Sequence, residues 1–327
     1  MKKSPKAKQM MDNLKIFCTF VRTKMQNGKI LYHLVAFLVV AIWGSTFVFT
    51  KLLLLGGLTA AQIFTLRFMI AYVMMLAFCL YKGIRWFSAS WQDEVLMALL
   101  GITGGSLYFL AENSAMNYTT TTNTSLIVSL SPLFASALIS MFYKSQRLNR
   151  IQTIGSLMAA VGVAMVVMNG HFVLHLSPKG DLLALTACLC WAVYSLLMIY
   201  ANAKYDTLFI TRKVFFYGLL AMIPYFMLHP GLGIYQLKGH ADLIWNLLFL
   251  GCVASMLCFL AWNWVLKKLG AVVATNYVYF NPVTTIIFAW LILSEHITVY
   301  FLIGTLLILI GMVMVDKYNK SSDNKAR

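Results

Sequence analysis

Glu112 is the acidic side chain that lies deepest in an apolar stretch of the sequence, within residues 101–132. A charged carboxylate in apolar surroundings is costly unless it is paired or hydrated. Tyr108 precedes it by one helical turn, and Arg67 lies at a comparable depth in the preceding apolar stretch. A carboxyl group that alternates between a dry environment and one beside a cation can take up and release a proton, or bind a cationic solute. We therefore predict that Glu112 and Arg67 form a proton-coupling or substrate-charge site.

Two alternatives stay open for this pair. Glu112 can instead be a surface-level carboxylate at the end of its helix. Arg67 can extend along its own aliphatic stem to the nearest polar surface, which is common for a cation near a helix end.

A second set of candidates consists of aromatic, hydroxyl and amide side chains on helical faces. Trp43, Thr46 and Thr50 recur at spacings of three and four, and Trp191 and Tyr194 repeat the pattern later. Aromatic faces with a few polar groups suit amphipathic or cationic organic solutes. Such stripes are also common where helices pack together. The predicted substrate-binding set is Trp43, Thr46, Thr50, Tyr108, Asn113, Asn123, Trp191, Tyr194, Asn263 and Tyr279.

Catalytic and metal chemistry find little support in the sequence. His171 and His175 are four residues apart, but no third ligand lies nearby, and the six cysteines lack zinc-ligand spacing. No hydrolase motif and no glycine-rich phosphate loop is present. We therefore expect no enzyme activity, no cofactor and no metal.

The composition is that of an integral membrane protein. The chain has 327 residues, of which 61% are apolar and 11% are charged, which is too little polar surface to cover a soluble globule. The net charge of +16 does not indicate nucleic-acid binding, because the aromatic residues fall inside apolar stretches and do not interleave with the basic ones. The expected partners are a lipid bilayer and a small-molecule substrate, and no nucleic acid.

Apolar stretches of about 20 residues, the length that crosses a bilayer, predict an all-α protein with ten transmembrane helices. The expected spans are 31–55, 60–81, 94–116, 120–143, 150–169, 180–202, 207–228, 242–266, 271–294 and 297–316. They divide the chain into a basic tail (1–30), a first five-helix unit (31–169), a connection (170–179), a second unit (180–316) and a C-terminal tail (317–327).

The basic residues predict the topology. Of the 26 Lys and Arg, 20 lie in the two tails and in the loops on one side of the predicted spans, and two, Lys179 and Lys238, lie on the other side. Cytoplasmic loops are the ones enriched in Lys and Arg. Both termini are therefore predicted to be cytoplasmic, as an even number of spans requires.

The chain contains its own sequence twice. A shift of 150 residues superimposes Gly101, Leu107, Phe109, Leu110, Ala111, Asn113 and Pro132 on Gly251, Leu257, Phe259, Leu260, Ala261, Asn263 and Pro282. Because each half has an odd number of spans, the second half enters the membrane from the opposite side, and the repeats are inverted. Inverted repeats place a substrate site near the midplane and open it alternately to each side.

Several short motifs occur in a meaningful order within these halves. They are Trp43-Gly-Ser-Thr46-Phe, Leu-Ser-Pro132-Leu-Phe, Asn281-Pro282 and Ser294-Glu295-His296-Ile-Thr. In this order the chain, over roughly residues 30–316, resembles the EamA-type branch of the drug/metabolite transporter superfamily. The resemblance implies ten helices around a central cavity and export of small metabolites, amino acids or drugs across a bacterial inner membrane.

We therefore predict a secondary transporter, an exporter of small organic metabolites, amino acids or drug-like solutes, in a bacterial inner membrane. Coupling to protons is an open alternative to an uncoupled facilitator of the same fold. A membrane-embedded lipid flippase or transferase is the alternative from another class. The sequence leaves the choice between monomer and homodimer open.

Overall fold

The computed structural model describes residues 5–143, 147–168, 177–293 and 298–325, and in these ranges all regular structure is helical. Eight helical segments are long and apolar enough to cross a bilayer. They are Ile30–Leu55, Ala60–Tyr81, Trp91–Ala115, Asn123–Phe142, Pro178–Lys204, Thr207–Leu228, Ala241–Leu269 and Ala271–Phe288. The predicted fifth and tenth spans fall on the shorter apolar helices Arg150–Val166 and Val299–Val315, so their crossing of the membrane stays a prediction.

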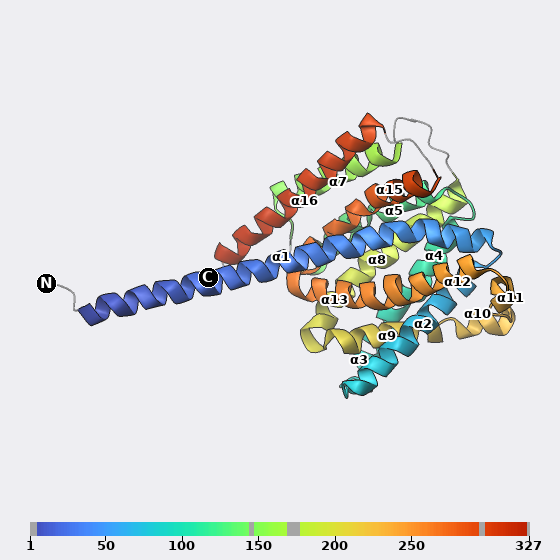
Figure 1. Ribbon diagram of the computed structural model, residues 1–327, viewed down its shortest axis with the longest axis horizontal. Helices are drawn as coiled ribbons and strands as arrows, with labels where there is room; N and C mark the ends of the chain where they lie inside the picture. Colours follow the sequence, from blue (N-terminus) through green and yellow to red (C-terminus); the bar gives the residue numbers. More distant parts are fainter. Residues whose placement is uncertain (1–4, 144–146, 169–176, 294–297, 326–327) are drawn as a thin grey trace.

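The first half of the chain contributes α1 to α7 (Figure 1). Their bounds are α1 Pro5–Leu55, α2 Ala60–Tyr81, α3 Trp91–Gly101, α4 Leu107–Ala115, α5 Thr121–Val128, α6 Ser131–Phe142 and α7 Arg150–Met168, with a π-helical segment, Ile102–Ser106, between α3 and α4. Helix α1 begins well before the predicted first span and extends beyond the bundle in Figure 1. Residues 5–30, predicted as part of a tail, are thus in the same helix as that span.

The second half repeats this order. It contains α8 Pro178–Lys204, α9 Thr207–Leu220, α10 Ile223–Leu228, α11 Ile234–Leu237, α12 Ala241–Leu248, a π-helical segment Phe249–Leu257, α13 Cys258–Leu269, α14 Ala271–Asn276, a 3-10 segment Tyr277–Phe280, α15 Asn281–Leu293 and α16 Val299–Lys325. The start of α1 and the end of α16 lie toward the same end of the bundle (Figure 1). The motif at residues 294–296 and the pair His171 and His175 lie outside the described residues.

Local sequence signals explain where the helices begin. The hydroxyl of Thr59 accepts a hydrogen bond from the backbone N–H of Gln62, whose side chain in turn accepts from the backbone N–H of Thr59. This reciprocal pair is a capping box, and it satisfies N–H groups that a helix start leaves free. Thr120 Oγ1 accepts from the backbone N–H of Asn123 at 3.0 Å and so caps the start of α5.

The helices are interrupted at matching places in the two halves. Each third span carries a π-helical segment, Ile102–Ser106 in the first half and Phe249–Leu257 in the second. Each fourth span is broken just before its proline, because a proline supplies no N–H and clashes with the preceding turn. The α-helix of each fourth span is therefore interrupted beside Pro132 and Pro282, in the second half by the 3-10 segment Tyr277–Phe280.

Helices α7 and α16 pack against each other through paired glycines (Figure 1). A Cβ atom built on Gly155 would lie 2.8 Å from the carbonyl oxygen of Gly311, and one built on Gly162 would lie 2.6 Å from that of Gly304. No larger residue fits at these points without separating the two backbones. Small residues that permit such an approach are typical of helix pairs in membranes.

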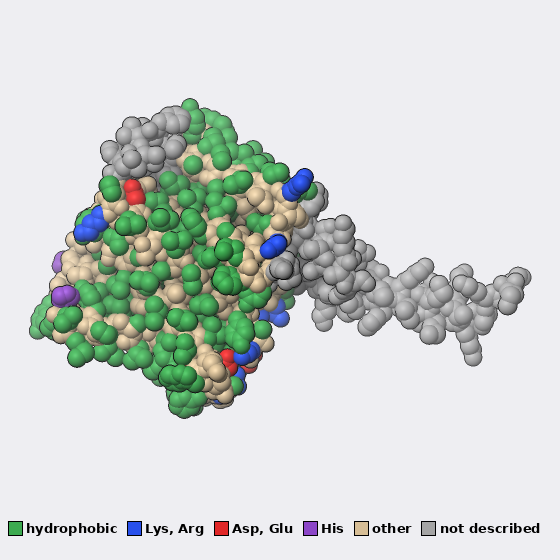
Figure 2. All heavy atoms as spheres, turned by 180° about the vertical axis from the view of Figure 1, so that it is seen from behind, with side chains coloured by type: hydrophobic (Ala, Val, Ile, Leu, Met, Phe, Trp, Pro, Cys, Tyr) green, Lys and Arg blue, Asp and Glu red, His purple; other side chains and the backbone are tan. Residues whose placement is uncertain are grey.

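The outer surface of the bundle is apolar. Large side chains such as Leu34, Val73, Leu157, Leu306 and Val313 are more than half exposed. Figure 2 shows hydrophobic side chains over most of the visible face, with Lys and Arg near its edges. In water such a surface would drive aggregation, whereas in a bilayer it faces lipid.

At the end of the bundle where α3 begins, two ion pairs join the two halves. The carboxylate of Glu94 on α3 accepts hydrogen bonds from Lys213 Nζ at 2.7 Å and Tyr217 Oη at 2.8 Å, both on α9. Asp93 accepts from Lys204 Nζ at 3.0 Å and from Tyr205 Oη at 2.7 Å. We call Asp93, Glu94, Lys204, Tyr205, Lys213 and Tyr217 the α3 ionic cluster.

The neighbouring cations Arg212 and Lys213 lie near the start of a predicted span, where we would expect anchors at the membrane surface, but the structure buries both. Arg212 is 3% exposed and Lys213 6%. Arg212 donates to the backbone carbonyls of Arg85 at 2.5 Å and Trp86 at 3.1 Å, in the loop before α3. These cations face inward because the loop and α3 supply buried acceptors that a sequence pattern does not reveal.

Candidate functional site

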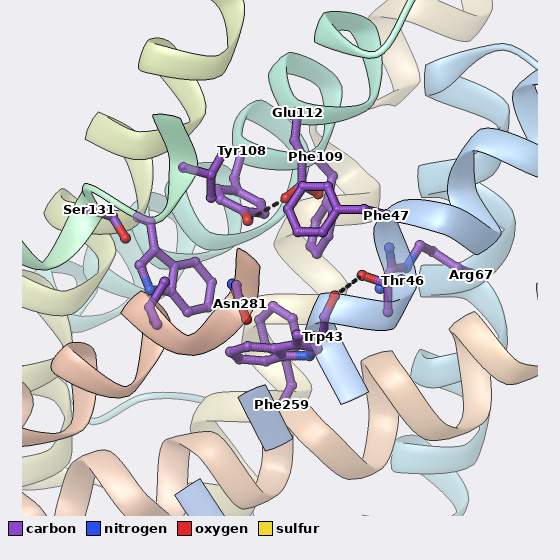
Figure 3. A pocket seen from close by; sticks show the side chains of 13 residues that line it. Trp43, Thr46, Phe47, Arg67, Tyr108, Phe109, Glu112, Ser131, Phe259 and Asn281 are labelled. Atoms are coloured by element: carbon purple, nitrogen blue, oxygen red, sulfur yellow. Dashed lines mark hydrogen bonds between the residues drawn. The ribbon is translucent and has the colours of Figure 1, made fainter. Parts of the chain in front are cut away.

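A small cavity lies where the interrupted helices of both halves meet (Figure 3). Its volume is about 20 Å³, enough for roughly one water molecule. It is lined by Trp43, Thr46, Phe47, Arg67, Tyr108, Phe109, Glu112, Val128, Ser131, Trp191, Phe259, Val278 and Asn281. A small organic solute needs several hundred Å³, so the cavity is too small to hold one in this structure.

Glu112 is buried in the wall of this cavity. The residue is 6% exposed, and Tyr108 Oη donates to its Oε1 at 2.6 Å. The predicted neighbour one helical turn away is thus its hydrogen-bond partner. Glu112 stands in the last turn of α4, and its side chain is turned into the bundle.

Arg67 is also buried, with 1% of its surface exposed, so it does not extend to a polar surface. Its Nε donates to Ser255 Oγ at 2.9 Å, and its guanidinium lies 4.4 Å from the ring centre of Phe109. Within the described chain, Arg67 Nη1 has no hydrogen-bond partner, and the ion pairs within 4.0 Å do not include Arg67 with Glu112. Both charges therefore line the cavity without direct contact (Figure 3).

Two tryptophans from corresponding helices meet beside these charges. The rings of Trp43 on α1 and Trp191 on α8 lie edge to face, with centres 5.4 Å apart. Trp43 Nε1 donates to the carbonyl of Ala254 at 2.9 Å, in the π-helical segment of the second half. The indole N–H of Trp191 has no partner in the described chain, although the residue is only 4% exposed. The cavity thus has an aromatic wall and a free, buried donor.

Six of the predicted binding residues do not line the cavity. Asn263 accepts from Tyr194 Oη at 2.5 Å and donates to Thr211 Oγ1 at 2.9 Å, so its polar atoms are used between helices. Asn123 donates to Asp181 at 2.6 Å and to Thr119. The others, Thr50, Asn113 and Tyr279, are buried in the bundle but outside the cavity wall.

The structure brings six of the predicted site residues together in this cavity wall, and seven residues that sequence reasoning missed complete it. The six are Trp43, Thr46, Arg67, Tyr108, Glu112 and Trp191. The missed residues are Phe47, Phe109, Val128, Ser131, Phe259, Val278 and Asn281. Six of these seven are related by the repeat: shifting Phe109, Val128 and Ser131 by 150 gives Phe259, Val278 and Asn281. The duplication could have identified them, because residues beside the proline break of one half have equivalents 150 residues away, beside the proline break of the other half.

A larger groove lies elsewhere, between α2 and the α9–α10 region. Its volume is about 540 Å³, and Thr65, Met69, Tyr72, Phe216, Leu219, Leu220, Met222, Ile223, Phe226, Met227 and Leu232 line it. The lining is almost entirely apolar and carries no charged group. We therefore place the chemistry in the smaller cavity.

The described residues offer no support for metal or disulfide chemistry. They contain no group of three or more His, Cys, Asp or Glu side chains arranged to hold a metal ion. Cys79, Cys188, Cys190, Cys252 and Cys258 are free thiols.

Comparison with known proteins gives consistent matches over nearly the whole chain. The model of the EamA-like transporter family matches twice, at residues 30–168 and 178–315. An uncharacterized transporter of Archaeoglobus fulgidus is 28% identical over 86% of this chain and 96% of its own length. The uncharacterized transporter YdfC of Bacillus subtilis is 25% identical over 86% of this chain and 91% of its own length.

Two further matches concern function and fold. A protein of Streptantibioticus cattleyicolor named as a probable terminal-alkyne amino-acid exporter is 24% identical over 90% of this chain and 95% of its own length. A solved crystal structure matches with a TM-score of 0.68 and 19% identity, over 87% of this chain and 94% of the other. That match concerns the fold alone.

Proposed function

The chain belongs to the EamA-like transporter family, and from this premise we propose that it is a secondary transporter that exports small organic solutes by alternating access. Membership makes it a multi-pass membrane transporter and not an enzyme. The observation that carries the finer proposal is the small cavity, in which Glu112 and Arg67 lie buried and unpaired with each other between walls from both halves. A site of this kind can bind solute only after it widens.

The proposed mechanism rests on the symmetry of the halves. We propose ten spans in two inverted repeats, with both termini in the cytoplasm of a bacterial cell and the protein in its inner membrane. The paired interruptions near the bundle centre support this arrangement, because broken helices at a repeat interface are typical of transporter binding sites. Rocking one half against the other would widen the cavity toward one side at a time.

The proposed substrate is an amphipathic solute that carries charge. The cavity wall has flat apolar faces from aromatic residues and one charged side chain of each sign, Glu112 and Arg67. The aromatic residues are Trp43, Phe47, Phe109, Trp191 and Phe259. The name of the Streptantibioticus relative, an amino-acid exporter, supports a solute with both an amino and a carboxylate group.

The apolar groove between α2 and the α9–α10 region bears on the alternative of a lipid flippase or transferase. A lipid carrier needs a polar path for headgroups along its membrane face, and this groove lacks one. The uncoupled facilitator differs from our proposal only in its energy source, so a gradient experiment separates them.

Purified protein in liposomes, screened with a panel of radiolabelled amino acids and amphipathic amines, tests the function. We expect a solute on the panel to accumulate when a pH gradient is imposed and to equilibrate without one. Equilibration that ignores the gradient would identify a facilitator. Movement of labelled lipid with no solute uptake would identify a flippase.

Removing both indoles should disable binding. We expect Trp43→Leu with Trp191→Leu to lower the apparent affinity for the accumulated solute at least about tenfold, because two buried aromatic contacts are lost. The concentration dependence of uptake measures this. Trp245→Leu, at a 71% exposed position, is the matched control. Unchanged affinity in the double variant would place the binding site elsewhere.

Labelling of single cysteines tests the topology. We expect a cysteine in place of Lys179 to react with a membrane-impermeant reagent added to intact cells, and a cysteine in place of Arg147 to react only after the cells are opened, because basic loops stay cytoplasmic. The reverse pattern would contradict the proposed orientation.

A further inference from the structure

The orientation of Arg67 depends on one hydroxyl group. Ser255 is fully buried, and its Oγ accepts the hydrogen bond from Arg67 Nε at 2.9 Å. The guanidinium also lies over the Phe109 ring, with its central carbon 4.4 Å from the ring centre. The bond at Nε and the contact with the ring together restrict the direction of the guanidinium.

This arrangement leaves one nitrogen of the guanidinium without a protein acceptor. Nη1 is buried and unpartnered in the described part of the chain. The nearest buried carboxylate on the cavity wall, that of Glu112, is already bonded to Tyr108 at 2.6 Å. A buried cation with an unpartnered N–H group needs a counter-charge, because an unpaired buried charge is costly.

Other free donors face the same space. Trp191 Nε1 and Ser131 Oγ both line the cavity and lack partners within the described residues. Three unpartnered donor groups therefore surround one small volume. A planar oxyanion satisfies such a set, since a guanidinium edge matches the two oxygens of a carboxylate.

The hydroxyl occurs only in the second half of the chain. The position equivalent to Ser255 in the first half, 150 residues earlier, is Gly105. Ser255 lies in the π-helical segment Phe249–Leu257, and such segments are frequent at functional sites. The hydrogen bond between Ser255 and Arg67 thus has no counterpart at the equivalent position of the first half, although much of the cavity wall is related by the repeat.

We propose that Ser255 is a positioning residue that holds Arg67 away from Glu112, so that Arg67 recognises the carboxylate of the transported solute. The inference rests on the proposed transport function and adds which group of the solute binds where. Without the Ser255 hydroxyl, the guanidinium loses its fixed direction and is free to turn toward Glu112.

Paired probes that differ only in the carboxylate test this role. L-phenylalanine and L-phenylalaninamide share an aromatic ring and an amino group, and only the first carries a carboxylate. Their Kd values are measured on purified wild-type protein and on Ser255→Ala, Ser255→Thr and Arg67→Gln. Ser136→Ala, which removes an unpartnered buried hydroxyl outside the cavity wall, is the control.

We expect wild-type protein to bind phenylalanine more tightly than the amide. Ser255→Ala should weaken phenylalanine binding about tenfold, the effect of losing one hydrogen bond to a charged group, and leave the amide unchanged. Ser255→Thr should restore most of the loss because it keeps the hydroxyl, and Arg67→Gln should remove the preference altogether.

Three outcomes would overturn the proposal. They are equal binding of both probes by wild-type protein, equal weakening of both by Ser255→Ala, and no binding of phenylalanine at all. None of these outcomes contradicts the proposed transport function. That proposal is contradicted separately, if no solute on the liposome panel is taken up. Normal elution of Ser255→Ala in size-exclusion chromatography distinguishes lost positioning from lost folding.

Discussion

Glu94→Gln should make the cavity more accessible from the end of the bundle where α3 begins. Glu94 joins α3 of the first half to Lys213 and Tyr217 on α9 of the second half. Glutamine removes the negative charge and leaves Lys213, whose side chain is 8% exposed, without its counter-charge. Losing one partner of a buried ion pair is strongly destabilising. The substitution should therefore lower the stability of the conformation in which this end is closed more than that of a conformation in which it is open.

A cysteine at Ser131, in a background without the native cysteines, reports the change. Ser131 lines the cavity and is fully buried in this conformation. We expect its reaction with a thiol reagent to become about tenfold faster in inside-out vesicles, a shift of roughly 1.4 kcal/mol between the two states. Asp206→Asn is the control, because the Asp206 side chain is 86% exposed and its contact with Lys267 is 3.8 Å long. An unchanged rate would show that the α3 ionic cluster only stabilises the fold.

At the opposite end of the bundle, apolar contacts take the place of the ion pairs. The position equivalent to Asp93, 150 residues later, is Leu243. Leu243 packs with Leu53, Leu58 and Ile63 in a buried apolar cluster, and a Cβ atom built on Gly56 would lie 2.6 Å from its side chain. Removing the charge of Glu94 should therefore increase access to the cavity only from the end where α3 begins. Faster labelling from that side of the membrane and unchanged labelling from the other would support this expectation.

The sequence predicted the helices and the duplicated plan because these depend on local signals. Apolar stretches of membrane-crossing length and the two proline breaks can be recognised without knowing any neighbour. The contact of Tyr108 with Glu112 was also predictable, since residues four apart meet on a helical face. The double match of the family model at residues 30–168 and 178–315 confirms the two repeats.

The remaining features depend on contacts between distant parts of the chain. Ser255 lies 188 residues from Arg67, and no periodic pattern links them. The burial of Arg212 and Lys213 cannot be recognised from the sequence, because their acceptors, a loop before α3 and Glu94, come from the other half of the chain. Asn263 and Tyr194 are both predicted to bind substrate, and no sequence pattern shows that they hydrogen-bond to each other between helices. A polar side chain within a predicted span thus indicated a buried position. It did not indicate the residue with which that side chain forms a hydrogen bond.

Glu112→Gln should abolish accumulation of solute against its gradient and leave exchange across the membrane largely intact. Glutamine keeps the size of the side chain and can still accept the hydrogen bond from Tyr108. It cannot take up or release a proton. If proton uptake by Glu112 drives the conformational change that resets the cavity, only the coupling step is lost.

The measurement compares two assays on the same liposomes. Uptake driven by an imposed pH gradient should fall to the level of protein-free liposomes, whereas exchange of internal labelled solute for external unlabelled solute should keep at least about half of its wild-type rate. Tyr108→Phe is the matched control, because it removes the hydroxyl that binds Glu112 and keeps the titratable carboxyl group. It should weaken transport and preserve the response to pH. Normal gradient-driven accumulation by Glu112→Gln would show that the carboxylate binds solute or supports the structure, and that the proton is carried by another group.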